Sequence, residues 1–335
     1  MYFTFISLDF KSIGGIQTYC KQFIEEFKKY KTLNIKKIEL NKKNIFSFKS
    51  IYSIYFLLNS KHIFLLHISF MKILFYVFFK KKITIFFYGI DIFKLENRLI
   101  KFLLRNNIYV KFVTCSNYSK DFAIKSLKVK KENINVIYPY SDFEKKIFKL
   151  NYKNTNNKKI KILSVSRLDG KITDGIWLMI NALKNYVNED IEFNIIGDGN
   201  QKSKMEKFVK ENNLKYIYFH GYQRQLIKFY EKTDITISIS DNAGFGISVL
   251  DSMFFGKPSI VSRNSASFEI YNDNNYKFSI KNDHSLDELI ILLKNLKQII
   301  QNDNHDYNQY YKKNYSFINY SETIKKYSNE LLNDN

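Results

Sequence analysis

Residues 235–258 read ITISISDNAGFGISVLDSMFFGKP. Residues 235–240 predict a short buried strand, and the apolar spacing of residues 246–255 predicts a helix. A polar loop that contains Gly244 joins them. A strand that leads into a helix through such a loop is typical of a βαβ unit, so this stretch predicts a parallel sheet.

The same alternation surrounds this stretch on both sides. In the second half of the chain, strands are expected at 160–166, 193–196, 216–219 and 259–262, and helices at 175–186, 202–211 and 225–232. In the first half, strands are expected at 2–7, 63–66, 83–87 and 112–115, and a helix at 16–30. Residues 302–314 are rich in Asn and Tyr and predict a surface loop, and residues 320–332 predict an amphipathic helix. The pattern predicts an α/β protein with a parallel sheet in each half.

The composition is that of a globular protein. The chain has 335 residues, of which 45% are apolar, and this length suits two domains of roughly 150 residues. Only 11 Gly and 2 Pro occur, which excludes collagen-like and proline-rich proteins. An Asn-rich run at 150–159 is the best candidate for a linker. We therefore expect domains at 1–150 and 151–315, and a C-terminal helix at 316–335 that packs back on the first domain.

Several classes of site and segment are not indicated by the sequence. Cys20 and Cys115 are far apart and form no CxxC pair, and the five histidines lack the spacing of metal ligands. We therefore expect no metal site and no cofactor. The N-terminus lacks the basic region of a signal peptide. The apolar stretch 64–79 is shorter than the ~20 residues that span a bilayer.

The positive charge is concentrated in the first half of the chain. The formal net charge is +21, and residues 1–150 carry 28 Lys and Arg against 10 Asp and Glu, whereas the remainder carries 25 against 22. This asymmetry, with apolar helices expected near 51–58 and 70–79, fits attachment to an anionic membrane surface, where each Lys contributes about 1 kcal/mol. A nucleic-acid-binding protein would also be basic, but no arginine-rich patch or recognised binding motif is present.

The scarce glycines lie mostly where a strand ends or a helix begins, which is where open parallel sheets bind ligands. Arg167 and Lys171 follow a strand and could hold a diphosphate; a solvated basic loop is the plainer explanation. Gly197 and its neighbours could equally be ordinary β-turn residues. The backbone amides of Gly246, Ile247 and Ser248 open a helix and suit a phosphate. Asp251, on the same helix, could bind ribose hydroxyls or merely complement the helix dipole.

These clusters, in this order, resemble the C-terminal domain of family 4 retaining glycosyltransferases of the GT-B fold. The matching segments are 166–168 (SRL) with Lys171, 196–199 (IGDG), 219–221 (FHG), and 244–258 with Asp251, Gly256 and Pro258. In the first half, Gly14-Gly15, Leu66-His67 and Tyr88-Gly89-Ile-Asp91 fall in the expected places. The resemblance is to enzymes of bacterial surface-polysaccharide synthesis. It implies two Rossmann-like domains that face a central cleft.

The resemblance also implies a role for each matching residue. Arg167 and Lys171 would hold the diphosphate of a UDP- or GDP-sugar during hexosyl transfer without a metal. Gly15 and Gly197 would approach the donor, Asp251 would bind its ribose, and Tyr222 and Gln223 would border its base. Residues expected on the acceptor side are His67, Tyr88 and Asp91. Two positions depart from the family pattern, because Ala243 replaces the first of two paired acids and Asp251 shortens the second.

The resemblance and the charge together favour a lipid-linked saccharide as acceptor. We expect a cytoplasmic protein, peripheral on the inner face of the cytoplasmic membrane, and no nucleic-acid partner. Two alternatives stay open at the level of the sequence. The first is a GT-B nucleotide-sugar epimerase, and the second is a relative without catalytic activity, which Ala243 would allow. Neither the donor base and sugar nor the oligomeric state follows from the sequence.

Overall fold

The computed structural model describes residues 2–8, 14–30, 34–40, 57–67, 81–89, 104, 109–147, 159–186, 190–240 and 245–333. These residues form two compact units, one of Met1–Pro139 with Ile318–Asn335 and one of Tyr140–Phe317. The second unit therefore begins before the Asn-rich run in which the boundary was expected. Most of that run lies outside the described residues, as do most of the apolar segments expected to be helices at 51–58 and 70–79.

The first unit is built on a six-stranded parallel sheet, called sheet A here. Its strands are β1 (Tyr2–Leu8), β2 (Asn34–Leu40), β3 (Ser60–Leu65), β4 (Lys82–Phe87), β5 (Val110–Thr114) and β6 (Ile134–Val136), in the order β2-β1-β3-β4-β5-β6. The four strands expected in this half are confirmed to within a few residues. The sequence analysis missed the two edge strands, β2, whose sequence NIKKIEL contains three charged residues, and β6, which has three residues. The chain reverses its direction of winding at β1, which pairs with both β2 and β3.

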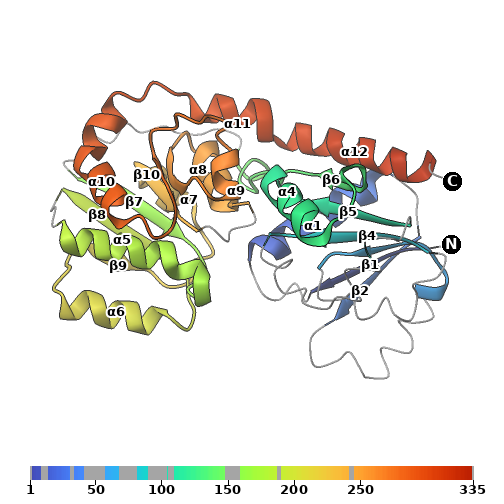
Figure 1. Ribbon diagram of the computed structural model, residues 1–335, viewed down its shortest axis with the longest axis horizontal. Helices are drawn as coiled ribbons and strands as arrows, with labels where there is room; N and C mark the ends of the chain where they lie inside the picture. Colours follow the sequence, from blue (N-terminus) through green and yellow to red (C-terminus); the bar gives the residue numbers. More distant parts are fainter. Residues whose placement is uncertain are drawn as a thin grey trace. The chain divides into compact units, whose positions relative to one another are not determined.

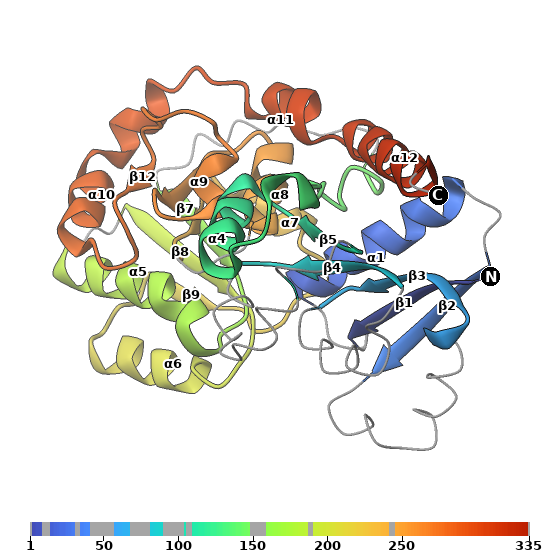
Figure 2. The same cartoon turned by 45° about the vertical axis from the view of Figure 1, so that its right-hand side comes forward.

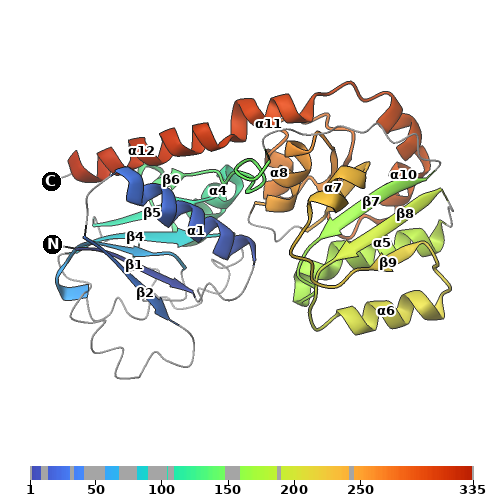
Figure 3. The same cartoon turned by 180° about the vertical axis from the view of Figure 1, so that it is seen from behind.

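Helices flank this sheet. They are α1 (Gly15–Phe27), which continues as the 3-10 turn η1 (Lys28–Tyr30), α4 (Asn117–Leu127), the 3-10 turn η4 (Lys131–Asn133) and the C-terminal α12 (Phe317–Asn333). Figures 2 and 3 show α1 and α12 side by side along sheet A. No helix among the described residues is long and apolar enough to cross a membrane.

The two faces of sheet A bury different kinds of side chain. The face toward α1 is aromatic: Phe5 and Phe64 are register partners and their rings stack 4.5 Å apart, and Phe23 of α1 meets Phe86 edge-on at 4.7 Å. The opposite face is aliphatic, with Ile63, Ile85 and Leu65 among its buried members. The central strands β1, β3, β4 and β5 are buried on both faces and are rich in apolar residues, as expected of a parallel sheet.

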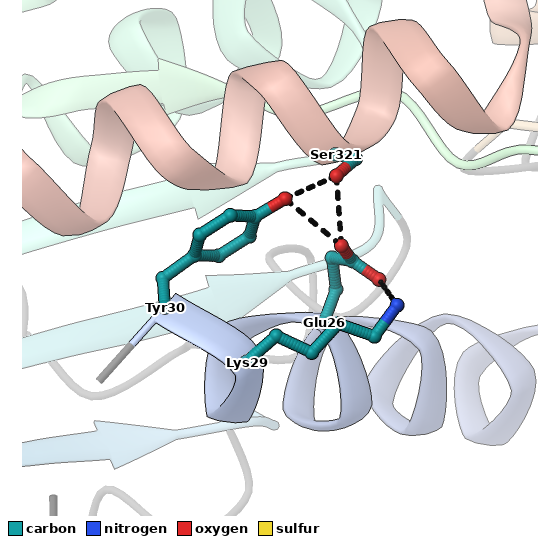
Figure 4. Close-up of polar contacts among 4 residues, drawn as sticks. All are labelled: Glu26, Lys29, Tyr30 and Ser321. Atoms are coloured by element: carbon teal, nitrogen blue, oxygen red, sulfur yellow. Dashed lines mark hydrogen bonds and ion pairs between the residues drawn. The ribbon is translucent and has the colours of Figure 1, made fainter. Parts of the chain in front are cut away.

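Helix α12 is joined to α1 by a buried polar cluster (Figure 4). The carboxylate of Glu26 is almost fully buried and accepts hydrogen bonds from Lys29 (2.7 Å), Tyr30 (3.0 Å) and Ser321 of α12 (2.8 Å). The hydroxyls of Tyr30 and Ser321 also contact each other. Because burying an unpaired carboxylate is costly, these three donors make the cluster a specific attachment point for α12.

The second unit repeats the architecture with a second parallel sheet, sheet B. Its strands are β7 (Ile160–Val165), β8 (Ile191–Ile196), β9 (Ile217–Phe219), β10 (Ile235–Ser238), β11 (Ser259–Ser262) and β12 (Ser279–Ile280), in the order β12-β11-β10-β7-β8-β9. Its helices are α5 (Asp174–Asn185), after the turn η5 (Gly170–Thr173), α6 (Lys202–Glu211), α7 (Ile227–Lys232), α8 (Ile247–Phe254), α9 (Ala266–Glu269), α10 (Leu286–Gln301) and α11 (Tyr307–Tyr315). The strands and helices expected at 160–262 are all present (Figure 1).

The prediction of a surface loop at 302–314 is wrong, because most of this segment forms helix α11. Tyr307, Tyr311 and Tyr315 recur every four residues and are all buried, so the tyrosines form the inner stripe of an amphipathic helix. The side chain of Asp306 caps the helix by accepting from the amide of Gln309 at 2.9 Å. Asn and Tyr have modest helix propensity, and burial of this stripe decides the structure instead.

Candidate functional site

Sheet B has its topological switch point between β7 and β10. From β7 the chain winds through β8 to β9 on one side, and from β10 through β11 to β12 on the other. In open parallel sheets, ligands bind outside the carboxyl ends of the strands at such a point. The second unit therefore has a candidate ligand site where β7 and β10 end, and the sequence-predicted donor residues of this unit lie in the loops and the helix that follow its strands.

Arg167 lies in the loop that follows β7, at this switch point. Its loop is held to the loop after β8, because Leu168 donates to Asp198 and accepts from Gln201, both at 2.9 Å through the backbone. The Arg167 side chain is exposed. Among the described residues, no carboxylate lies within ion-pair distance of it. An exposed, unpaired guanidinium on a fixed loop is suited to an anionic ligand.

Gly197 allows the loop after β8 to approach the loop after β7. Gly197 has φ +148°, and a Cβ there would lie 1.8 Å from the carbonyl oxygen of Ser166. The Gly197 amide donates to the carbonyl of Gly221 at 2.9 Å. Gly197 thus has a structural requirement of its own, whether or not a ligand contacts it.

The loop after β9 carries the residues expected to border the base. Tyr222 is exposed, and the Gln223 side-chain amide donates to the carbonyl of His220 at 2.7 Å. The His220 ring in turn hydrogen-bonds Asn194 of β8 at 2.6 Å. Burial lowers the pKa of His220, against the opposing effect of the Glu192 charge, so the ring is neutral at physiological pH. This loop is therefore well anchored, and Tyr222 projects from it.

Helix α8 begins at the same edge of sheet B. Gly246 is its N-cap, with φ +92°, and a Cβ there would contact the hydroxyl of Ser267 at 2.3 Å. Ile247 and Ser248 form the first turn, whose amides carry the partial positive charge of the helix N-terminus. The helix thus presents donors for a phosphate at this edge.

Asp251 lies on α8, one turn after Ile247, and is partly buried. Its Oδ1 accepts a hydrogen bond of 2.5 Å from the hydroxyl of Ser141. Burial raises the pKa of Asp251 to about 7, with Asp142 adding to the rise and Ser141 and Lys146 opposing it. The carboxyl group is therefore poised between its two protonation states near neutral pH. The contribution of Ser141 was not foreseen, since no motif points to it.

Residues 171 and 243 are not fully described. The backbone of Lys171 lies in η5, but its side chain lies outside the described part of the chain. Ala243 lies wholly outside it. The expectations for these two positions stay predictions.

The residues expected to face the acceptor lie in the first unit. His67 follows β3, next to the switch point of sheet A at β1. Gly15, which was expected to approach the donor, also belongs to this unit, where it begins α1 and is exposed. The Tyr88 ring packs against that of His67 at 6.4 Å, but its hydroxyl is buried and donates to the carbonyl of Leu66 at 3.1 Å. The Tyr88 hydroxyl is therefore engaged within the protein. Asp91 lies outside the described residues.

The described residues include no group of three His, Cys, Asp or Glu side chains arranged to hold a metal ion. Cys20 and Cys115 are both buried and unpaired with each other. The Cys20 thiol instead contacts the hydroxyl of Tyr88 at 3.1 Å. These thiols belong to the interior of the first unit.

The family to which the chain belongs follows from residues 145–314, which match the family described as "Glycosyl transferases group 1". This match covers half of the chain and nearly all of the second unit. The protein belongs to the group 1 glycosyltransferases. It is therefore a glycosyltransferase, and the carboxyl edge of sheet B is the part of the family domain that carries the predicted donor residues.

Solved structures of other proteins share the fold of this one over its whole length. A glycosyltransferase from Rickettsia africae ESF-5 has a TM-score of 0.76 at 18% identity, covering 100% of this chain and 99% of its own. Alr3699/HepE of Anabaena, in complex with UDP and glucose, has a TM-score of 0.72 at 13% identity, covering 99% of each chain. The lipopolysaccharide outer core galactosyltransferase WaaB, in its apo form, has a TM-score of 0.72 at 14% identity, covering 98% of this chain and 100% of its own.

This glycosyltransferase accordingly has the GT-B architecture of two parallel-sheet α/β domains. At such low identity the structural matches establish the fold only. No curated protein matches the sequence. The chemistry of this particular chain must therefore be argued from its own residues.

Proposed function

We propose that this enzyme is a family 4 retaining glycosyltransferase that moves a hexose from a UDP-sugar to a lipid-linked saccharide. The observation that carries the proposal is Arg167, an exposed cation that follows β7 at the switch point of sheet B and has no ion-pair partner among the described residues. The departing nucleoside diphosphate gains negative charge as the anomeric carbon–oxygen bond breaks. Preorganised cations and amides stabilise that charge.

We assign a role in the donor site to each of the expected residues. Arg167 and Lys171 hold the diphosphate, and the amides of Ile247 and Ser248 at the start of α8 contact its oxygens. Asp251 receives the ribose hydroxyls, and Tyr222 covers the base. These groups supply the charge that the leaving diphosphate needs, which supports transfer without a metal or other cofactor.

Uridine is proposed as the base on the strength of the relatives. Alr3699/HepE is described in complex with UDP and with UDP-glucose. The anchored loop at Gly221–Gln223 provides backbone groups and the ring of Tyr222 for a base. GDP-sugars are the alternative donors, and the nucleotide-binding test described below distinguishes them from UDP-sugars.

The acceptor side is proposed to bind a lipid-linked saccharide of a cell-surface polysaccharide, at the inner face of the cytoplasmic membrane. Two observations support this. The first 150 residues carry 28 Lys and Arg against 10 Asp and Glu. WaaB, which shares the fold, is described as a lipopolysaccharide outer core galactosyltransferase. His67, Tyr88 and Asp91 of the first unit are the residues proposed to lie on the acceptor side.

The donor assignment is tested by the binding of nucleotides to the full-length protein. UDP, GDP, ADP and CMP are compared by thermal shift, because a ligand at 100 times its Kd stabilises by about 2.7 kcal/mol. We expect UDP to stabilise most, and Arg167→Ala to weaken UDP binding about tenfold or more, since hydrogen bonds to charged groups are strong. UDP-sugar hydrolysis should fall in parallel and should persist in EDTA.

Lys207→Ala is the matched control. Lys207 is an exposed cation of the same unit, on α6, paired only with Glu211 at 3.7 Å. Its loss removes the same formal charge away from the predicted site, and we expect nucleotide binding to be unchanged. Equal weakening of UDP binding in both variants would contradict the assignment of Arg167, and so would unchanged binding in Arg167→Ala.

A further inference from the structure

The carboxylate of Asp251 is one end of a hydrogen-bond network that lies within the second unit. The Ser141 hydroxyl donates to Asp251 Oδ1 at 2.5 Å, across 110 residues of sequence. Bonds of this length between a hydroxyl and a carboxylate belong to the strong, charge-assisted class. Since a carboxylate accepts about four hydrogen bonds, this contact leaves most of its capacity available.

Ser141 is itself held rigidly. It is fully buried, its backbone amide donates to the hydroxyl of Tyr311 at 2.9 Å, and its own hydroxyl also accepts from the amide of Phe143 at 3.3 Å. The Tyr311 hydroxyl donates onward to Glu144 at 2.8 Å. The hydroxyl of Ser141 therefore points at Asp251 from a position fixed by its neighbours.

Helix α11 completes the network. The Tyr311 ring packs edge-on against Phe254 of α8 at 5.5 Å, and the Asn308 side chain donates to the Phe254 carbonyl. The segment at residues 141–147 thus contacts both α8, through Asp251, and α11, through Tyr311. Helix α8 cannot turn about its axis without breaking the bond between Ser141 and Asp251.

The charged and titratable groups around Asp251 come from three elements. Asp142 and Lys146 lie on the segment of Ser141, with opposing effects on Asp251. Tyr230 of α7 is fully buried, and its hydroxyl has no hydrogen-bond partner among the described residues. Tyr311 of α11 is the remaining titratable group near Asp251. Of the groups around Asp251, Ser141 is the hydrogen-bond donor to it.

We propose that Ser141 is a positioning residue of the donor site, which fixes the Asp251 carboxyl group so that it can accept the ribose hydroxyls of the nucleotide. This inference rests on the proposed function and extends it to a residue outside the family motifs. Ser141 acts through Asp251 and need not touch the donor. Tyr311 and Glu144 hold Ser141 in place.

The proposal predicts a particular pH dependence. The Ser141 hydrogen bond lowers the pKa of Asp251 against the effect of burial, so its removal raises the pKa above about 7. A larger fraction of Asp251 is then protonated at neutral pH. In Ser141→Ala, we expect UDP to bind about tenfold more weakly near pH 6.5 and to recover toward the wild-type affinity near pH 9.

The experiment measures the Kd of UDP by titration calorimetry between pH 6 and 9, on full-length variants. Ser141→Thr keeps the hydroxyl and should restore the wild-type profile, and Asp251→Asn should bind weakly at every pH. Ser328→Ala is the control, because Ser328 is an equally buried serine on α12 whose hydroxyl bonds only locally, to the Lys325 carbonyl. It should leave the profile unchanged.

A second readout does not need nucleotide binding. Carbon-13 NMR of aspartate carboxyl groups, assigned with Asp251→Asn, follows the titration of Asp251 directly, and Ser141→Ala should shift its midpoint upward. An unshifted midpoint, or a loss of UDP affinity by the same factor at every pH, would overturn the proposal. Failure of the wild-type protein to bind UDP at any pH would overturn the proposed function, and the donor role of Ser141 with it. The midpoint of the Asp251 titration, measured by NMR, would still report whether Ser141 controls the protonation of Asp251.

Discussion

At the residue scale, the structure separates side chains that are free to meet a ligand from those that are not. Arg167 and Tyr222 are exposed, whereas the hydroxyl of Tyr88 is buried and donates a hydrogen bond to the Leu66 carbonyl. All three were expected at a binding site from their positions in the sequence. A motif specifies the position of a residue along a strand end, but not the partners that its polar atoms find.

Substitution of Gly197 tests whether the close approach of two loops at the carboxyl edge of sheet B requires glycine. Gly197→Ala places a Cβ against the Ser166 carbonyl at a φ that alanine rarely adopts, so we expect the second unit to lose about 3 kcal/mol or more. Trp177, the single tryptophan, lies in α5 of that unit, and its fluorescence during chemical denaturation reports the change.

Gly170→Ala is the control for Gly197→Ala. Gly170 also has a positive φ, of +56°, but a Cβ there would meet nothing within 4 Å. Its substitution should cost only about 1 kcal/mol, the ordinary cost of a left-handed alanine. If the two variants were equally stable, the close approach of Gly197 to Ser166 would not be what requires glycine.

At the scale of elements, single helices are defined by contacts with remote parts of the chain. The stripe of Tyr307, Tyr311 and Tyr315 becomes a helix because it packs inward, although its composition resembles a loop. Helix α12 is amphipathic as expected, and Tyr320, Ile324 and Tyr327 on its inner side are buried. The periodicity of α12 was visible because its apolar positions include aliphatic residues, whereas α11 has only tyrosines.

The attachment of α12 to α1 predicts a pH-dependent stability of the first unit. Burial raises the pKa of Glu26, but hydrogen bonds from Lys29, Ser321 and Tyr30 outweigh this, and the net pKa is lowered from 4.5. A lowered pKa means that the contribution to stability is complete above about pH 4.5 and is lost as the pH falls below the folded-state pKa. Glu26→Gln should lower stability by about 2 kcal/mol at pH 7 and much less near pH 3.

Calorimetric unfolding between pH 3 and 7 measures this difference, with Trp177 fluorescence marking the transition of the second unit. Glu25→Gln is the neighbouring control, since Glu25 is exposed and pairs with Lys21 only at 3.8 Å. A surface pair of this kind contributes less than about 1 kcal/mol. A constant difference between wild type and Glu26→Gln across the whole pH range would show that the charge of Glu26 is not what holds α12.

At the scale of the whole molecule, the two halves of the chain carry different charges on the same kind of sheet. The excess of Lys and Arg in residues 1–150 is not needed by a parallel sheet, because the second unit builds one with almost balanced charge. The sheet itself therefore does not account for the excess. An anionic membrane surface is the partner proposed above.

Liposome flotation tests this partner. We expect the full-length protein to float with vesicles that contain anionic lipid at low salt, and not with neutral vesicles, because each Lys near the surface contributes about 1 kcal/mol. Raising the salt to about 0.5 M should release it, since the Debye length shrinks below 10 Å. Equal recovery with neutral and anionic vesicles would refute attachment through charge.

The sequence by itself determined most of the alternation of strands and helices, the presence of a parallel sheet in each half and the clustering of Arg167, Gly197, Gly221 and Gly246 at strand ends. It could do so because parallel strands place all their carboxyl ends on one edge, so positions along the chain translate into one region of space. Only the tertiary structure decided that Ser141 reaches Asp251, that Glu26 holds α12 and that the tyrosines of 307–315 are interior. Those features depend on contacts between residues far apart in the chain, for which local patterns carry no signal.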